Sequence, residues 1–241
     1  MVRRRNAPAR EGATLTGGTA KPLPVTDRGR RTRAHIVEAA SVLMYQNGVR
    51  AASLDDVLKA AGCGKSQLYH YFDDKADLVG AVIDHQLEFV LAAQPALAQI
   101  GSWATFDAWL AGILRMHTAP GGPFACPLGT LAVELKNDEA HRQRLEAAFG
   151  RWAALLAEGL RRMRDRGDLT PDADPERLAT NAIAALQGGM LLGRVRADIT
   201  PMRDAVDAAK AQLRRWSNAA DDRPSQPPRA KEHHRGRIAN S

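Results

Sequence analysis

The sequence predicts an all-α protein. Helix start and stop signals recur between about residues 31 and 216, and this region shows no convincing alternation of apolar and polar residues of the kind that marks a half-buried strand. The composition, 44% hydrophobic and 25% charged residues, is ordinary for a chain that buries a core. A length of 241 residues allows one or two domains.

Four helices are predicted in the first part of this region. The first has apolar residues at helical spacing and Gly48 placed to end it in a left-handed turn. Ser53 begins the second as its N-cap, and Asp56 follows three residues later, as in a capping box. A Gly-Cys-Gly run at 62–64 separates it from a short third helix. The four predicted segments are 31–46, 53–61, 65–71 and 73–95.

Five further helices are predicted toward the C-terminus. Ser102 can cap the first of them, and a loop rich in Gly and Pro covers 120–127. Asp174 and Thr200 each stand as a capping residue before a proline, which suits the first position of a helix. The five predicted segments are 102–118, 128–135, 138–166, 174–196 and 200–216.

The two ends of the chain differ from the body in composition. Residues 1–27 and 217–241 lack apolar periodicity and are expected to be disordered, because they cannot bury enough apolar surface to offset chain entropy. Residues 1–33 carry a net charge of +7, whereas residues 34–216 hold 20 basic and 22 acidic side chains. A basic arm is therefore expected before the first helix.

Several classes of protein are excluded by what the sequence lacks. No apolar run approaches the roughly 18 residues of a membrane span, and no secretory signal is visible, so we expect a soluble, cytoplasmic protein without a membrane partner. Two cysteines make no disulfide framework, and no zinc-binding spacing occurs. Because no catalytic constellation is assembled, we expect no enzymatic activity, no catalytic residue, no metal and no cofactor.

The second and third predicted helices, with the glycine-containing turn between them, form a helix-turn-helix pattern. The second helix of such a unit lies in the major groove of DNA. Lys reaches phosphate or a guanine edge, Gln pairs with adenine, and Ser or Tyr bonds phosphate. On spacing alone, ordinary packing of two short helices in a bundle is an equal alternative. The expected exposed face consists of Lys65, Ser66, Gln67, Tyr69 and His70.

Residues 31–82 as a whole resemble the DNA-binding domain of the TetR/AcrR family of transcriptional regulators. The most specific stretch is Leu-Tyr-His-Tyr-Phe at 68–72, followed by Lys75 and Leu78. The resemblance implies a three-helix DNA-binding domain at 28–76, a helical ligand-binding and dimerisation domain at 77–216, and a homodimer on double-stranded operator DNA. The family's DNA contacts would fall on Ser53, Gly64, Lys65, Ser66, Gln67, Tyr69, His70 and Lys75.

Two positions depart from the family pattern, and the charge of the domain is unusual. Gly64 stands where Ser or Thr normally caps the recognition helix, and Ser66 stands where Gly or Ala is common. Residues 34–90 hold four basic and eight acidic side chains, a poor inventory for binding a polyanion. We therefore hypothesise that the arm supplies phosphate or minor-groove contacts; the alternative is a solubilising tail. The arginines concerned are Arg28, Arg30, Arg31 and Arg33.

The C-terminal half resembles the branch of this family that includes the LmrA/YxaF-type repressors, in its Cys126–Leu135 stretch and in Leu-Gln-Gly-Gly at 186–189. Some members of that branch respond to flavonoids and drugs, so the resemblance implies a small apolar or aromatic inducer. Core packing is the alternative for each aromatic side chain, and a thiol sensor at Cys126 is a further one. The predicted ligand-binding residues are Trp103, Phe106, Trp109, His117, Phe124, Cys126, Phe149, Trp152 and Gln187.

A stripe of small and apolar residues on the last two helices predicts a dimer interface with two-fold symmetry. Together with the resemblance, it indicates a repressor that a ligand releases from a palindromic operator; a constitutive DNA-binding protein without small-molecule input is the competing interpretation. The predicted interface residues are Ala182, Leu186, Gly189, Met190, Gly193, Ala205, Ala209 and Leu213.

Overall fold

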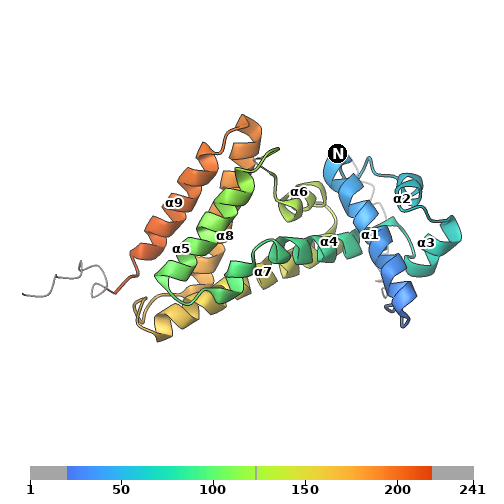
Figure 1. The fold of residues 1–241 in the computed structure, drawn as a ribbon. Helices are drawn as coiled ribbons and strands as arrows, with labels where there is room; N and C mark the ends of the chain where they lie inside the picture. Colours follow the sequence, from blue (N-terminus) through green and yellow to red (C-terminus); the bar gives the residue numbers. More distant parts are fainter. Residues whose placement is uncertain (1–20, 123, 219–241) are drawn as a thin grey trace, which may run out of the picture. The chain divides into compact units, whose positions relative to one another are not determined.

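The computed structural model describes residues 21–122 and 124–218, and within these ranges the chain is all-α, as the sequence predicts (Figure 1). No strand occurs in the described ranges; the one β-type pairing there is an isolated bridge between Leu169 and Ser217. The helices are α1 (Asp27–Asn47), α2 (Leu54–Ala60), α3 (Lys65–Tyr71), α4 (Lys75–Ala92), the 3-10 helix η1 (Pro95–Gln99), α5 (Trp103–His117), α6 (Pro127–Glu134), α7 (Glu139–Asp165), α8 (Pro175–Arg196) and α9 (Thr200–Arg214).

The chain forms two compact units that divide inside α4, the first ending at His85 and the second beginning at Gln86. The sequence placed this boundary earlier, after residue 76. Neither unit has a described helix that is both long and apolar enough to cross a membrane.

The first unit is held together by one face of α1, which packs against α2 and α3. Ile36, Ala40 and Met44 line this face at helical spacing and are almost completely buried. Leu68 from α3 and Phe72 just after it are also fully buried. Helix α3 and the residue after it are therefore fixed to the core by two large apolar side chains.

The second unit is built around long helices. Helix α8 packs against α7 and α9, and α9 also contacts α5 (Figure 1). Small residues permit the close approach: a Cβ atom added to Gly189 of α8 would lie 2.9 Å from Ala205 Cβ of α9. At Gly159 of α7 an added Cβ would lie 2.7 Å from Ile100 Cβ.

The predicted dimer stripe is therefore mostly internal. Of the eight residues predicted for it, seven are buried within the subunit and Ala205 is half-buried. These residues pack α8 within its own unit, including against α9. This corrects the prediction that they face a second subunit. The residues concerned are Ala182, Leu186, Gly189, Met190, Gly193, Ala205, Ala209 and Leu213.

Helix α1 begins four residues earlier than predicted, because Thr26 caps it. The Thr26 hydroxyl accepts a hydrogen bond from Gly29 N at 3.1 Å, and Asp27 places a carboxylate in the first turn. At its other end Gly48 has φ of 87° as expected, but ψ of 155° is extended rather than left-handed helical. Arg28 and Arg30, which the sequence places before the first helix, thus lie within it together with Arg31 and Arg33.

Three other local predictions change. The 3-10 helix η1 was not predicted. Thr200 is the first residue of α9 rather than its cap, because Asp198 Oδ1 accepts hydrogen bonds from Thr200 N and Thr200 Oγ1, each at 3.0 Å. Ordered structure also continues to Asn218, whose side chain donates to Gly167 O at 2.7 Å. The predicted disorder of residues 1–20 and 219–241 lies outside the described residues.

Candidate nucleic-acid interface

Helix α3 turns nearly all of its polar side chains to solvent. Leu68 is its single buried residue, and Tyr71 is half-buried. Because Leu68 lies in the middle of a two-turn helix, its insertion into the core leaves the opposite face free. Tyr69 is 48% exposed, so its ring and hydroxyl are accessible to a partner. The exposed residues are Lys65, Ser66, Gln67, Tyr69 and His70, the face that the sequence predicts.

The capping box at the start of α2 is present as predicted. Ser53 Oγ accepts from Asp56 N at 3.1 Å, and Ser53 N donates to Asp56 Oδ2 at 3.2 Å. The Ser53 hydroxyl also donates to Asp56 Oδ2 at 2.6 Å, and these hydrogen bonds lower the pKa of Asp56. The hydroxyl of Ser53 is thus already engaged, so a phosphate would have to share it.

The side chain of Lys65, the first residue of α3, reaches across to α2. Its Nζ is 3.3 Å from Asp55 Oδ1 of α2, and both side chains are well exposed. Exposed pairs of this kind contribute little to stability because water screens them. Lys65 can therefore exchange this carboxylate for a phosphate at small cost. Lys75 makes one long hydrogen bond, in which its Nζ donates to Arg50 O at 3.4 Å.

Two glycines shape the turn between α2 and α3. Gly62 has φ of 57°, a left-handed conformation that favours glycine. Gly64 is the N-cap of α3 with φ of −86° and ψ of 161°, and no side chain caps this helix. A Cβ atom added to Gly64 would meet nothing within 4 Å. The structure thus agrees with the sequence that the cap is missing, and it leaves room for one.

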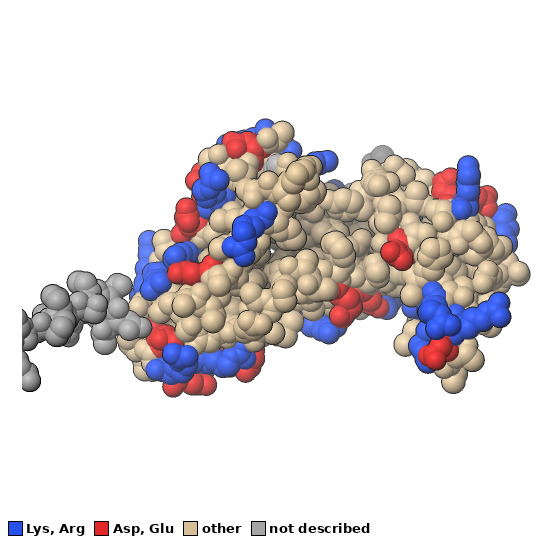
Figure 2. Space-filling model, in the orientation of Figure 1, with Lys and Arg blue, Asp and Glu red and all other residues tan. Residues whose placement is uncertain are grey.

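The arginines of α1 divide into two groups. Arg30 pairs with Asp27 and donates to Pro24 O at 3.3 Å, and the Arg33 guanidinium lies over the Phe72 ring at 5.0 Å. These two side chains act within the chain, which argues against Arg33 as a free DNA contact. Arg28 and Arg31 are exposed. Figure 2 shows Lys and Arg side chains gathered at the end of this unit where α1 begins.

Lys21 is a further residue at this surface that sequence reasoning missed. Its Nζ lies 2.9 Å from Asp73 Oδ1 and donates to Tyr69 O, at the C-terminal end of α3. A cation there interacts favourably with the negative end of the helix dipole. The hydrogen bond from Lys21 to Tyr69 joins residues 48 positions apart, so no local sequence pattern predicts it.

The nine predicted ligand-binding residues lie in the second unit in several groups. Trp103, Phe106 and Trp109 form a row of aromatic contacts along α5, and Phe149 stacks near Trp152 with ring centres 6.3 Å apart. Trp109 Nε1 donates to the buried Gln94 Oε1 at 3.0 Å, and the Arg214 guanidinium covers Trp103 at 3.9 Å. These contacts give Trp103, Phe106 and Trp109 a clear role in core packing.

His117 and Phe124 form another group. His117 is buried, its Nδ1 accepts from Phe124 N at 3.2 Å, and burial lowers its pKa. The imidazole is therefore neutral at pH 7, with its proton on Nε2, so that it presents a donor.

Cys126 and Gln187 form the last group, around the first turn of α6. Burial raises the pKa of the Cys126 thiol, although the Gln187 side chain and the N–H groups of Leu128 and Gly129 oppose this effect. A thiol with a raised pKa is a poor nucleophile, which argues against the sensor interpretation. Gln187 Oε1 lies 2.6 Å from where a Cβ of residue 129 would stand, so a larger residue there would require the Gln187 side chain to shift.

Comparison with known proteins identifies both parts of the chain. Residues 36–82 match the model of bacterial regulatory proteins of the tetR family, and residues 102–209 match that of the tetracyclin repressor-like C-terminal domain. An uncharacterized HTH-type transcriptional regulator in the lacX 3′ region of Lactococcus lactis subsp. lactis is 30% identical over 193 residues, covering 76% of this chain and 94% of the relative.

Two other proteins extend the comparison. The HTH-type transcriptional repressor DhaR of Mycobacterium sp. (strain GP1) is 22% identical over 174 residues, which cover 70% of this chain and 86% of DhaR. The crystal structure of a TetR-family regulator from Cytophaga hutchinsonii shares the fold, with a TM-score of 0.70 at 20% identity, covering 80% of this chain and 98% of that one. The relatives and matched families are transcriptional regulators rather than enzymes, and this chain belongs to the TetR family of bacterial transcriptional regulators.

Proposed function

We propose that this regulator is a repressor that binds a palindromic operator as a homodimer and leaves it when a small apolar or aromatic molecule binds the second unit. The observation that carries DNA recognition is α3, a helix with one buried anchor and five exposed side chains that can bond bases or phosphates. The name of the relative DhaR, a repressor, supports the direction of control.

The proposed DNA contacts combine base readout with phosphate positioning. Gln67 and Lys65 carry donors that match adenine and guanine edges. Tyr69 and Lys75 suit phosphate, and Arg31 of α1 is exposed near the same helix. Arg33 is left out because it packs on Phe72. The proposed set is Arg31, Ser53, Gly64, Lys65, Ser66, Gln67, Tyr69, His70 and Lys75.

Dimerisation is proposed to use an exposed apolar face of α8. Leu191, Leu192 and Val195 are 63%, 48% and 75% exposed, a clustering that soluble subunits normally cover. An isologous contact through this face would present two recognition helices to the two half-sites of a palindrome. Glutamate at Leu191 and Val195 is expected to yield monomers in analytical ultracentrifugation, with folding monitored by circular dichroism.

The ligand is proposed to lie among the half-buried residues of the second unit and Trp152. Trp152 Nε1 is buried with no hydrogen-bond partner among the described residues, so it can donate to an acceptor on a ligand. The half-buried members of the predicted ligand-binding set are Phe124, Phe149 and Gln187. The ligand must bind the DNA-free conformation better than the DNA-bound one, since equal affinity for both shifts nothing.

DNA recognition is tested by binding of the purified protein to the duplex that flanks its own gene, with footprinting to locate the operator. Gln67→Ala and Tyr69→Ala are each expected to weaken binding by about 1–3 kcal/mol. Tyr45→Ala, at another exposed tyrosine on α1, is the matched control and is expected to bind as the wild type does. Wild-type affinity in both α3 variants would contradict the assignment.

Induction is tested by thermal shift against a panel of aromatic and hydrophobic compounds, followed by operator release. A compound that stabilises the protein and releases DNA supports the proposal. Compounds that stabilise the protein without any loss of DNA affinity would favour constitutive binding instead.

A further inference from the structure

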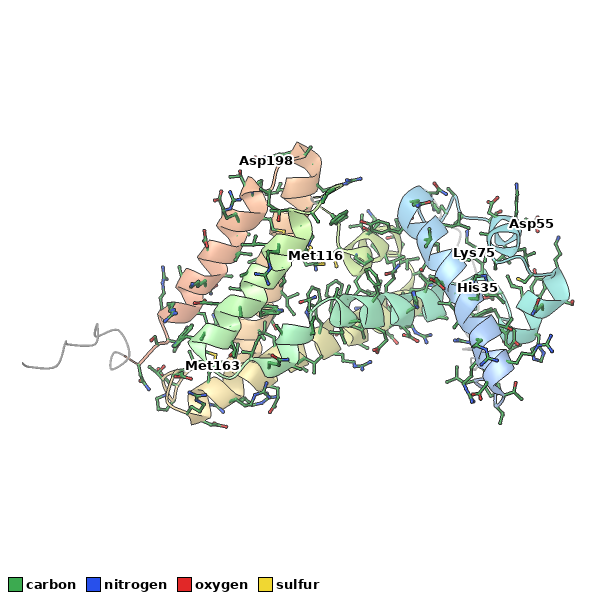
Figure 3. The ribbon with its side chains drawn as sticks, viewed as in Figure 1. His35, Asp55, Lys75, Met116, Met163 and Asp198 are labelled. Carbon is green, nitrogen blue, oxygen red and sulfur yellow. The ribbon has the colours of Figure 1, made fainter. Side chains whose placement is uncertain are left out.

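A hollow of about 300 Å³ opens in the first unit between α1 and the turn that precedes α3. It lies beside the proposed DNA-binding face, because Gln67 of α3 is part of its wall. Figure 3 shows His35 on α1, which forms the opposite wall. The lining residues are Arg31, Thr32, His35, Ile36, Ala61, Gly62, Cys63 and Gln67.

The polar groups around this hollow are chiefly hydrogen-bond donors. Arg31, His35 and Gln67 are exposed, and no described residue accepts a hydrogen bond from their side chains. Thr32 is different, because its hydroxyl donates to Arg28 O at 3.0 Å. None of the eight lining residues is an Asp or Glu. The hollow therefore offers a guanidinium, an imidazole and a carboxamide without a carboxylate to neutralise them.

Arg31 differs from Arg30 and Arg33, and unlike the exposed Arg28 it lines the hollow. Arg30 is held by Asp27 and by backbone carbonyls, and Arg33 lies on Phe72. Arg31 has no such partner among the described residues, although it is flanked by both. A guanidinium left unpaired beside a hollow is suited to bind an oxyanion, which it can hold with two parallel hydrogen bonds.

The turn leaves the mouth of the hollow uncrowded. A Cβ atom added to Gly62 or Gly64 would meet nothing within 4 Å, so a group from outside can approach the backbone there. Ile36 and Ala61 are buried and form an apolar base. The Arg31 guanidinium is exposed to solvent, so an anion bound to it would keep part of its hydration.

We propose that the hollow receives one phosphate of the operator backbone, held by Arg31 and His35 from α1 and by Gln67 from α3. The inference rests on the proposed DNA binding and adds to it a specific phosphate site, with His35 as a contact. Helices α1 and α3 of the first unit then contact the same DNA strand, which fixes how deeply α3 enters the groove. Free inorganic phosphate offers the same oxyanion chemistry, and the experiment below distinguishes it from a phosphate of the operator.

Cys63 provides a direct probe, because it lines the hollow and is half-buried, whereas the other cysteine, Cys126, is buried in the second unit. Alkylation by N-ethylmaleimide is followed at both cysteines by mass spectrometry, with and without operator duplex. We expect the operator to slow modification of Cys63 in proportion to the fraction of protein bound. Cys63 that reacts equally fast in the saturated complex would overturn the proposal.

Substitutions in the hollow give a second measurement, the salt dependence of DNA binding, which a merely structural role would not change. Arg31→Ala and His35→Ala are compared with Lys59→Ala, which removes a cation of the same unit outside the hollow. Loss of one phosphate contact is expected to reduce the slope of log K against log salt by about 0.9 for Arg31→Ala, and the slope for Lys59→Ala is expected to stay as in the wild type. Equal slopes in wild type and Arg31→Ala would overturn the assignment.

Two outcomes separate the possible failures. If the wild type binds no duplex specifically, the proposed function itself fails. If it binds, but Cys63 is unprotected and the Arg31→Ala slope is unchanged, only the phosphate site fails. Protection of Cys63 by inorganic phosphate alone, at ionic strength matched with potassium chloride, would assign the hollow to a free anion and overturn the operator contact.

Discussion

Helix α3 buries one of its seven residues, whereas helix α8 buries nine of its 22. Both carry residues that suit contact with another molecule, but the residue types differ. Polar side chains on α3 find few partners within the chain and stay exposed. Small and apolar residues on α8 fit equally well against a neighbouring helix of the same subunit, and α9 takes that place. Polarity therefore specifies an external surface far better than smallness does.

The largest expected effect tests how much α3 depends on its anchor. Leu68→Ala removes a fully buried side chain and is expected to lower the free energy of unfolding by about 2–5 kcal/mol, because a cavity replaces it. Tyr69→Ala, one position away and exposed, is expected to change it by no more than about 0.5 kcal/mol. Chemical denaturation measures both. Equal losses would show that Tyr69 also anchors α3.

The next effect tests the packing of α8 against α9. Gly189→Ala is expected to destabilise the protein by about 1–3 kcal/mol, since the new Cβ would lie 2.9 Å from Met202 Cα and from Ala205 Cβ. Gly188→Ala is the matched control, because nothing lies within 4 Å of its added Cβ and alanine favours a helix by about 1 kcal/mol. A stable Gly189→Ala variant would mean that α8 and α9 separate easily.

A smaller effect tests whether the missing side-chain cap of α3 limits stability and DNA binding. Gly64→Ser is expected to gain at most about 0.5 kcal/mol of stability, because serine caps a helix only slightly better than glycine. It also supplies a hydroxyl for phosphate, so operator affinity is expected to rise. Gly62→Ser, at φ of 57°, is expected to destabilise the protein by about 1 kcal/mol. Thermal unfolding and DNA titration of both variants check this pair.

The smallest effect concerns pH and the capping box. Hydrogen bonds from Ser53 lower the pKa of Asp56 below its ordinary value of 3.8. The contribution of Asp56 is therefore fully present above that value and is lost as the pH falls through the lower pKa of the folded state. Wild type is expected to exceed Asp56→Asn in stability at neutral pH, and the two are expected to converge in acid. A constant difference down to the lowest pH at which the protein folds would contradict this.

The sequence by itself determined the all-α class, most helix positions and the exposed face of α3. These features follow from local signals: apolar residues at helical spacing in the first helix, the Ser53 cap with Asp56, and the glycines of the turn. Such signals act between residues close together in the chain, so they can be recognised in the sequence alone.

The tertiary structure decided which surfaces remain available. Sequence spacing does not predict that α9 packs on Gly189 or that the Arg33 guanidinium lies over the Phe72 ring. It also does not predict that Lys21 contacts the end of α3. Each of these contacts joins residues far apart along the chain, and each depends on which of several chemically suitable partners the packing brings near. The hollow that brings Arg31 and Gln67 to one site depends on the same packing.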